Sequence, residues 1–155
     1  DPKAFAQIRK HFDEIYPIIA KHDGAVVKTM GDAVMSAFSN PLNALKAARI
    51  LQSCFQETRK DLCLRLRISL NMGPCIAVSL NSNIDYFGKV VNAAAKFQTF
   101  AKAGEIVFSD CILQVPEVKG YIESQEVTLE TSKYDSPSST KPIPLHRWNT
   151  FSQFI

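Results

Sequence analysis

Residues 24–38 read Gly-Ala-Val-Val-Lys-Thr-Met-Gly-Asp-Ala-Val-Met-Ser-Ala-Phe. Two short apolar runs, residues 25–30 and 33–38, flank Gly31-Asp32, and a two-residue connection of this kind is a strong hairpin signal. The pattern predicts a β-hairpin with Asp32 at its tip, where the carboxylate can project from the sheet edge. Glycine and aspartate are also common in turns for backbone reasons alone, so the turn by itself assigns no function.

The same segment carries two candidate functional side chains. Asp32 is a candidate ligand for a divalent cation, because Mg²⁺ is usually held by one or two carboxylates together with substrate phosphates. Lys28 lies in a strand of otherwise apolar and small residues. A lysine there is either an edge residue whose charge reaches solvent or a cation aimed into a cleft, and the segment alone leaves both interpretations open.

Residues 84–97 form the second informative segment, Ile-Asp-Tyr-Phe-Gly-Lys-Val-Val-Asn-Ala-Ala-Ala-Lys-Phe. The pattern places Asp85 in a loop just before a helix, with Gly88 at the entry. Asn92 and Lys96 are four residues apart and therefore share one helix face. An amide donor beside a cation can bind an oxyanion or a phosphate. The alternative is a polar, solvent-facing stripe on an alanine-rich helix.

Outside these two segments, the chain alternates helix-like and strand-like stretches. Amphipathic periodicity predicts helices, apolar-polar alternation predicts strands, and a polar run predicts a loop. The predicted helices cover residues 5–22, 40–59 and 90–101, the further strands cover 63–70, 75–80, 105–108 and 143–148, and the loop covers 131–141. Helices interleaved with hairpins indicate an α/β packing with a mostly antiparallel sheet.

The composition is typical of one globular domain over residues 1–155. Hydrophobic residues make up 46% of the chain and charged residues 21%. The net charge is +3, and no basic run with interleaved aromatics suggests a nucleic-acid track. No signal peptide or membrane-spanning apolar run is visible, so neither nucleic acid nor membrane is an expected partner of these residues.

The four cysteines show neither CxxC pairing nor metal-ligand spacing to a histidine. Cys54 and Cys75 lie among apolar neighbours, so we expect both to be buried, reduced thiols. Reduced thiols indicate a reducing compartment. The expected location is therefore the cytoplasm, or the cytoplasmic face of a membrane if the parent protein is anchored elsewhere.

Taken together, the motifs resemble the catalytic domain of the class III adenylate/guanylate (nucleotidyl) cyclase family. The resemblance rests on their order and spacing, and it extends over nearly the whole chain. The matching stretches are HFDEIYPIIAKHDGAVVK (11–28), KTMGDAVMSAF (28–38), NPLNALKAAR (40–49), DYFGKVVNAAAK (85–96) and GEIVFSD (104–110).

For the fold, the resemblance implies a ferredoxin-like βαββαβ core that pairs head to tail, with active sites between two subunits. The family's first strand carries the first metal aspartate and a small-residue loop for the phosphates. Residues 1–5 resemble the helix just after that strand. We therefore expect the chain to begin after the first strand, and no residue here is assigned as the first metal ligand.

For the site, the resemblance implies a role for each candidate residue. Asp32 matches a metal-binding aspartate of a site that holds two divalent ions, Mg²⁺ or Mn²⁺. Lys28 and Asp85 match the pair that reads the purine edge, and a donor with an acceptor complements adenine rather than guanine. Asn92 matches the residue that orients the ribose. Lys96 stands where the family usually has arginine, so the charge is kept but the bidentate fork is lost.

The implied activity is that of an adenylate cyclase, which converts ATP to 3′,5′-cyclic AMP and pyrophosphate. The implied partners are ATP, a second copy in a head-to-tail homodimer, and regulatory domains outside these residues. The alternative is a catalytically silent domain that acts in dimerisation or nucleotide sensing. A ferredoxin-like RNA-binding module is disfavoured, because the strands lack an exposed aromatic pair within a basic motif.

Overall fold

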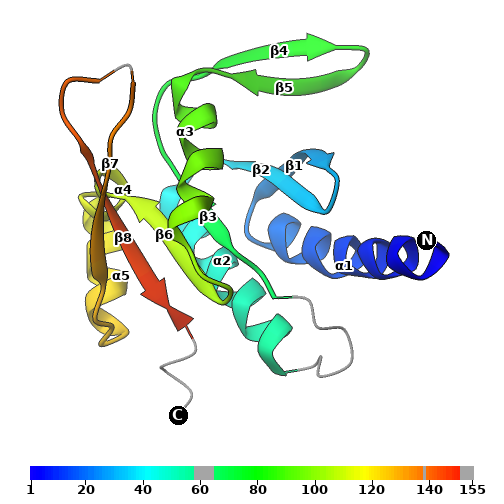
Figure 1. Ribbon diagram of the computed structural model, residues 1–155, viewed down its shortest axis with the longest axis horizontal. Helices are drawn as coiled ribbons and strands as arrows, with labels where there is room; N and C mark the ends of the chain where they lie inside the picture. Colours follow the sequence, from blue (N-terminus) through cyan, green and yellow to red (C-terminus); the bar gives the residue numbers. More distant parts are fainter. Residues whose placement is uncertain (58–64, 138, 151–155) are drawn as a thin grey trace.

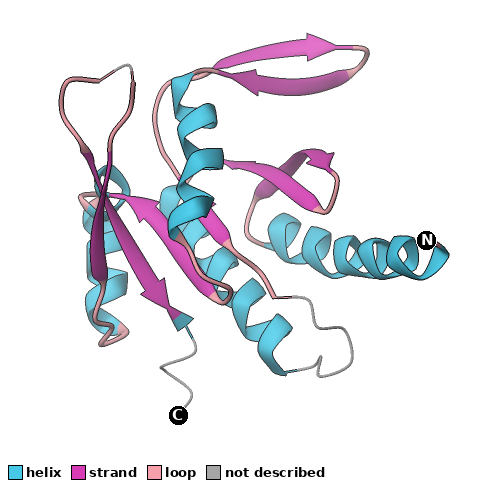
Figure 2. Cartoon of the chain, in the orientation of Figure 1, coloured by secondary structure: helices cyan, strands magenta, loops and turns pink. Residues whose placement is uncertain are grey.

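The computed structural model describes residues 1–57, 65–137 and 139–150. The helices are α1 (Pro2–Lys21), α2 (Pro41–Glu57), α3 (Lys89–Phe97), the short 3-10 turn η1 (Gln98–Phe100), α4 (Asp110–Leu113) and α5 (Pro116–Ser124). The strands are β1 (Gly24–Met30), β2 (Ala33–Phe38), β3 (Ile68–Leu70), β4 (Ile76–Leu80), β5 (Asn83–Phe87), β6 (Glu105–Ser109), β7 (Glu130–Tyr134) and β8 (Ile143–Asn149). Figure 1 shows their arrangement along the chain, and Figure 2 distinguishes helices from strands.

A four-stranded sheet of order β3-β6-β8-β7 forms the centre of the molecule. β3 runs parallel to β6, and the other two pairings are antiparallel. Side chains alternate between the faces of a strand, so Ile106 and Phe108 of β6 pack with α2 and α5, whereas Val107 packs with Phe97 of α3. α2 and α5 therefore cover one face of the sheet, and α3 covers the other (Figure 1).

α1 and the β1–β2 hairpin form a separate layer beside this sheet. Asp1 caps α1 by accepting a hydrogen bond from the Lys3 backbone N–H at 3.0 Å. The helix continues through Pro17 to Lys21. Its buried face packs against α2 and the hairpin in an apolar cluster whose buried members are Ile15, Ile19, Leu51 and Phe55.

The second hairpin, β4–β5, projects away from the sheet (Figure 1). Its turn residues Asn81 and Ser82 both have positive φ, 49° and 69°, which suits the twist of a two-residue hairpin. Gly88 ends β5 with φ +147°, a conformation that favours glycine, and α3 begins at the next residue. The hairpin therefore leads directly into α3.

The structure confirms the predicted hairpin around Gly31-Asp32, the predicted helices at the beginning of the chain and after Asn40, and the closing strand. Asn40 caps α2, because its Oδ1 accepts hydrogen bonds from the backbone N–H groups of Leu42 and Asn43 at 2.9 and 3.4 Å. The strand predicted over 105–108 is also present as β6.

Four local predictions are wrong. Asp85 lies in β5 rather than in a loop, and residues 131–134 of the loop predicted over 131–141 belong to β7, with residue 138 outside the described residues. The strand predicted over 63–70 is restricted to β3, with 63–64 outside the described residues. Cys75 is exposed rather than buried, because it lies just outside β4 on the projecting hairpin, and Cys54 is half-buried.

No helix in the described ranges combines the length and apolar character needed to cross a bilayer.

Candidate active site

Lys28 and Asp85 are in contact although 57 positions separate them in the chain. Lys28 Nζ donates a hydrogen bond to Asp85 Oδ2 at 2.9 Å, and the opposite charges form an ion pair. The register of β1 against β2 shifts by one residue between Val26 and Lys28. A bulge of this kind re-aims nearby side chains. The Lys28 ammonium is therefore directed at Asp85, while 39% of the surface of its side chain remains exposed.

The Asp85 carboxylate is held at both oxygens. Oδ1 accepts the backbone N–H of Tyr86 at 2.8 Å, while Oδ2 accepts from Lys28. The hydrogen bond from Lys28 is the main reason why the pKa of Asp85 is lower than usual, and the Tyr86 N–H acts in the same direction. Asp85 is therefore ionised at neutral pH and can only accept hydrogen bonds.

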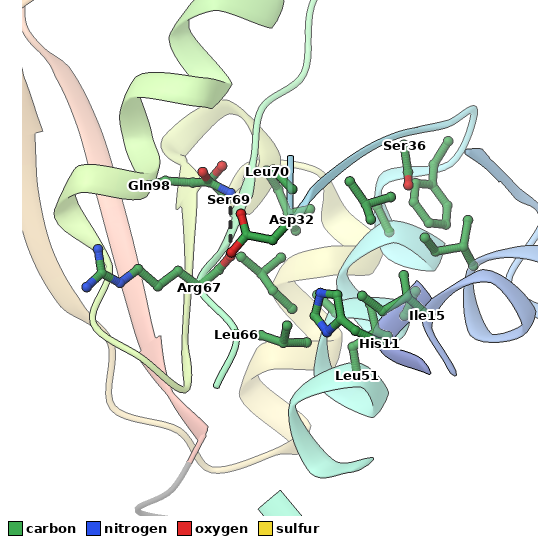
Figure 3. Close-up of a pocket in the computed structure, with 18 residues that line it drawn as sticks. His11, Ile15, Asp32, Ser36, Leu51, Leu66, Arg67, Ser69, Leu70 and Gln98 are labelled. Carbon is green, nitrogen blue, oxygen red and sulfur yellow. Dashed lines mark hydrogen bonds between the residues drawn. The ribbon is translucent and has the colours of Figure 1, made fainter. Parts of the chain in front are cut away.

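Asp32 lies in the turn of the β1–β2 hairpin, as the sequence predicts, and is exposed. Gly31 adopts a φ of +61°, which lets the chain reverse in two residues. The Asp32 side chain borders a cavity of about 180 Å³ between α1, α2, β2 and β3 (Figure 3). The polar residues that line this cavity are His11, Asp32, Ser36, Arg67, Ser69 and Gln98.

His11 reaches the same cavity from α1. Its side chain is buried, with 8% of its surface exposed. Burial lowers the pKa of His11 below its usual value, and the nearby Asp32 carboxylate opposes this effect. Its Nδ1 has no hydrogen-bond partner among the described residues. The cavity therefore places a buried imidazole close to the carboxylate of Asp32.

Two strand edges border this cavity. β2 pairs only with β1, and β3 pairs only with β6, so each is an edge strand within the described part of the chain. Apolar side chains of α1 and α2, among them Ile15, Ile19 and Leu51, cover one side of the space between the edges. The cavity thus combines an apolar wall with unpaired backbone groups at two strand edges.

Asn92 and Lys96 lie on α3, where both are exposed. Their spacing of four residues places them on one helix face, as the sequence predicts. Neither residue lines the cavity that Asp32 borders. The five candidate residues therefore fall into three groups within one chain: the ion pair of Lys28 and Asp85, Asp32 at the cavity, and the exposed pair on α3.

Sequence reasoning did not single out two residues near these groups. His11 belongs to the amphipathic helix α1, where its only signal is that it is a polar residue on the buried face of the helix. Phe87 lies between Asp85 and Gly88 in the quoted segment, and its ring centroid is 5.9 Å from Lys28 Nζ. Within the described ranges, no three histidine, cysteine, aspartate or glutamate residues gather into a metal-binding group.

Comparisons with known proteins identify a family whose model matches most of the chain. The adenylate and guanylate cyclase catalytic domain family matches residues 2–133. "Putative adenylate cyclase 3" of Rhizobium meliloti is 26% identical over an alignment of 137 positions that covers 86% of this chain and 22% of that protein. Receptor-type adenylate cyclase ESAG 4 of Trypanosoma brucei brucei is 23% identical over an alignment of 184 positions, gaps included, that covers 92% of this chain and 15% of that protein.

The solved structure of the guanylyl cyclase Cya2 has the same fold, with a TM-score of 0.80 at 17% identity. The likeness covers 96% of this chain and 81% of that one. The present chain spans only 22% and 15% of the length of the two curated relatives. The relatives include both adenylate and guanylyl cyclases, so their names alone do not assign a base preference.

Proposed function

Because the chain belongs to the adenylate and guanylate cyclase catalytic domain family, we propose that it is an adenylate-type cyclase domain. In this proposal it forms 3′,5′-cyclic AMP and pyrophosphate from ATP at a site completed by a second copy of the chain. The observation that carries the adenine assignment is the contact of Lys28 Nζ with Asp85 Oδ2 at 2.9 Å.

The base assignment follows from the hydrogen-bonding capacity of these two side chains. A lysine ammonium can only donate, and an ionised aspartate can only accept. Adenine presents an acceptor at ring N1 and a donor at its 6-amino group, which this pair complements. Guanine presents a donor at N1 and an acceptor at O6, which would face the wrong partners. The lowered pKa of Asp85 supports the acceptor role at neutral pH.

Asp32 supplies the metal-binding side chain in this proposal. It is exposed in a tight turn beside the cavity, and it offers hard carboxylate oxygens. Such a donor fits Mg²⁺ or Mn²⁺, which in nucleotide sites are held by one or two carboxylates together with the substrate phosphates. A pair of divalent ions would neutralise negative charge on the triphosphate and lower the pKa of the ribose 3′-hydroxyl.

A second copy of the chain is the proposed source of the remaining groups. Asn92 would orient the ribose and Lys96 would stabilise charge on the transferred phosphoryl group, but both lie outside the cavity bordered by Asp32. A two-fold pair would bring Asp32 of one protomer to the α3 face of its partner. Exposed apolar side chains on the β4–β5 hairpin, Ile76 at 68% and Leu80 at 53%, support a protein interface there.

The cavity between β2 and β3 supports a further strand in the proposed site. An extended strand could pair with both strand edges and pack on the apolar wall, which would join the β1–β2 hairpin to the four-stranded sheet. In the family, the first strand carries the first metal aspartate, and we propose that such a strand would occupy this place. We therefore place the second carboxylate ligand on a strand that fills this cavity.

The proposal is tested by measuring cyclic nucleotide formation from ATP and from GTP by the full-length protein with Mn²⁺. We expect cyclic AMP to be the main product. Equal turnover of both nucleotides would contradict the base assignment. Nucleotide binding with no product from either would instead support the alternative, a catalytically silent domain.

A further inference from the structure

Phe87 is an exposed aromatic residue that core packing does not explain. It lies on β5 with 46% of its surface exposed, and it belongs to none of the three apolar clusters of the described residues. Side chains of a strand alternate between its faces, so Phe87 shares a face with Asp85, whereas Ile84 lies on the opposite face. The side chain therefore faces the ion pair of the candidate site.

The Lys28 ammonium has contacts on two sides. Nζ lies 2.9 Å from Asp85 Oδ2 and 5.9 Å from the centroid of the Phe87 ring. The face of an aromatic ring attracts a cation at such a distance, because its π electrons carry partial negative charge. Lysine is a long and flexible side chain. A second contact therefore restricts the positions that the ammonium can occupy.

We propose that Phe87 is a positioning residue that holds the Lys28 ammonium where it donates to the purine base. This inference rests on the proposed function, in which Lys28 and Asp85 read the base. A donor that is already fixed loses less conformational freedom when the base binds, so the base binds more tightly. The effect requires a π face, so tyrosine or tryptophan can replace Phe87, whereas leucine cannot.

A spectroscopic test examines the contact without any catalysis. The full-length protein is labelled with ¹³C at the lysine ε-carbons, and the Lys28 signal is assigned by its loss in a Lys28→Met variant. Protons near an aromatic face are shielded, so we expect this signal to be shifted upfield from the other lysines. The shift should persist in Phe87→Tyr and disappear in Phe87→Leu. An unchanged Lys28 signal in Phe87→Leu would overturn the inference.

Nucleotide affinity provides the second readout. Calorimetry with 3′-deoxy-ATP, which lacks the nucleophilic hydroxyl, should give a dissociation constant about two- to fivefold higher for Phe87→Leu, as expected for an exposed cation–π contact. Phe87→Tyr should bind like the wild type. Ile84→Ala is the matched control, because it removes an exposed apolar side chain from the opposite face of the same strand.

The outcomes separate this inference from the cyclase proposal and from a purely interfacial role. Sedimentation of each variant measures its monomer–dimer equilibrium. Weaker dimerisation of Phe87→Leu with unchanged nucleotide affinity would make Phe87 an interface residue and overturn the inference. A wild type that binds 3′-deoxy-ATP but forms no cyclic nucleotide from ATP would refute the cyclase activity, while the effect of Phe87 on binding would still support its positioning role.

Discussion

The four-stranded sheet and the two hairpins consist of similar short strands, but their side chains have different surroundings. Every residue of β6 is buried, and Phe108 and Trp148 have no exposed surface. On the β4–β5 hairpin, Ile76 and Phe87 are 68% and 46% exposed. The two inner strands of the sheet, β6 and β8, complete their contacts within one chain, whereas the β4–β5 hairpin leaves apolar side chains exposed. Substitutions in the buried strands should therefore change stability, and substitutions of Lys28, Asp85 or Phe87 in the hairpins should change binding and activity.

The largest expected effect is on the stability of the sheet. Phe108→Ala removes a fully buried ring between α2 and α5, and we expect it to lower the free energy of unfolding by about 3–5 kcal/mol. Ile84→Ala, on the exposed hairpin, should change it by less than about 0.5 kcal/mol. Urea titration followed by circular dichroism measures both. Similar losses for the two variants would remove the distinction between the regions.

The next effect concerns base choice in the hairpins. Lys28→Glu combined with Asp85→Cys replaces the adenine-complementary pair by the guanine-type pair of the family. We expect the ratio of kcat/KM for ATP over GTP to fall by up to about a hundredfold, since well-made hydrogen bonds are lost for one base and gained for the other. Initial rates with each nucleotide measure this. If the ratio stays at its wild-type value, these residues do not read the base.

The smallest effect is a pH dependence within the sheet region. His146 Nε2 and Asp110 Oδ1 are 2.8 Å apart, and this hydrogen bond is the main reason why the pKa of Asp110 is lowered. A lowered pKa in the folded state stabilises the fold above the ordinary aspartate pKa, and this stabilisation is lost as pH falls through the lowered value. Because the Asp110 carboxylate is partly exposed, its interaction with His146 adds less than about 1 kcal/mol to the free energy of unfolding.

The measurement compares the unfolding free energies of the wild type and Asp110→Asn at pH 7 and at pH 3. The wild type should be slightly more stable at pH 7, and the difference should shrink at pH 3. A difference that grows toward acid would show that the interaction of Asp110 with His146 does not stabilise the fold.

The sequence predicted those elements whose signals are local. The turn at Gly31-Asp32 and the capping of α2 by Asn40 each depend on neighbouring residues. The sequence predicts a loop over residues 131–134 of β7, because Thr-Ser-Lys-Tyr is a polar run; in the structure, Tyr134 is the one buried residue of β7. It is a strand because it pairs with β8, and that tertiary pairing leaves no pattern within the segment itself.

The candidate site shows the same division. Spacing alone placed Asn92 and Lys96 on one helix face, but it could not bring Lys28 to Asp85 across 57 positions. That pairing came from the family resemblance, and the contact at 2.9 Å agrees with it. Asp85 lies in a strand because β5 pairs with β4 through the turn at Asn81-Ser82, and this turn contains no glycine, so it gives only a weak hairpin signal.

A site shared between two copies of the chain is tested most directly by mixing two variants that are inactive alone. Asp32→Asn and Lys96→Ala, made in the full-length protein, should each be inactive alone. After mixing and subunit exchange, a mixed dimer holds one site with both substitutions and one with neither. We predict recovery to about a quarter of wild-type activity, since about half of the dimers are mixed and each has one intact site of two. No recovery despite demonstrated subunit exchange would contradict the shared site.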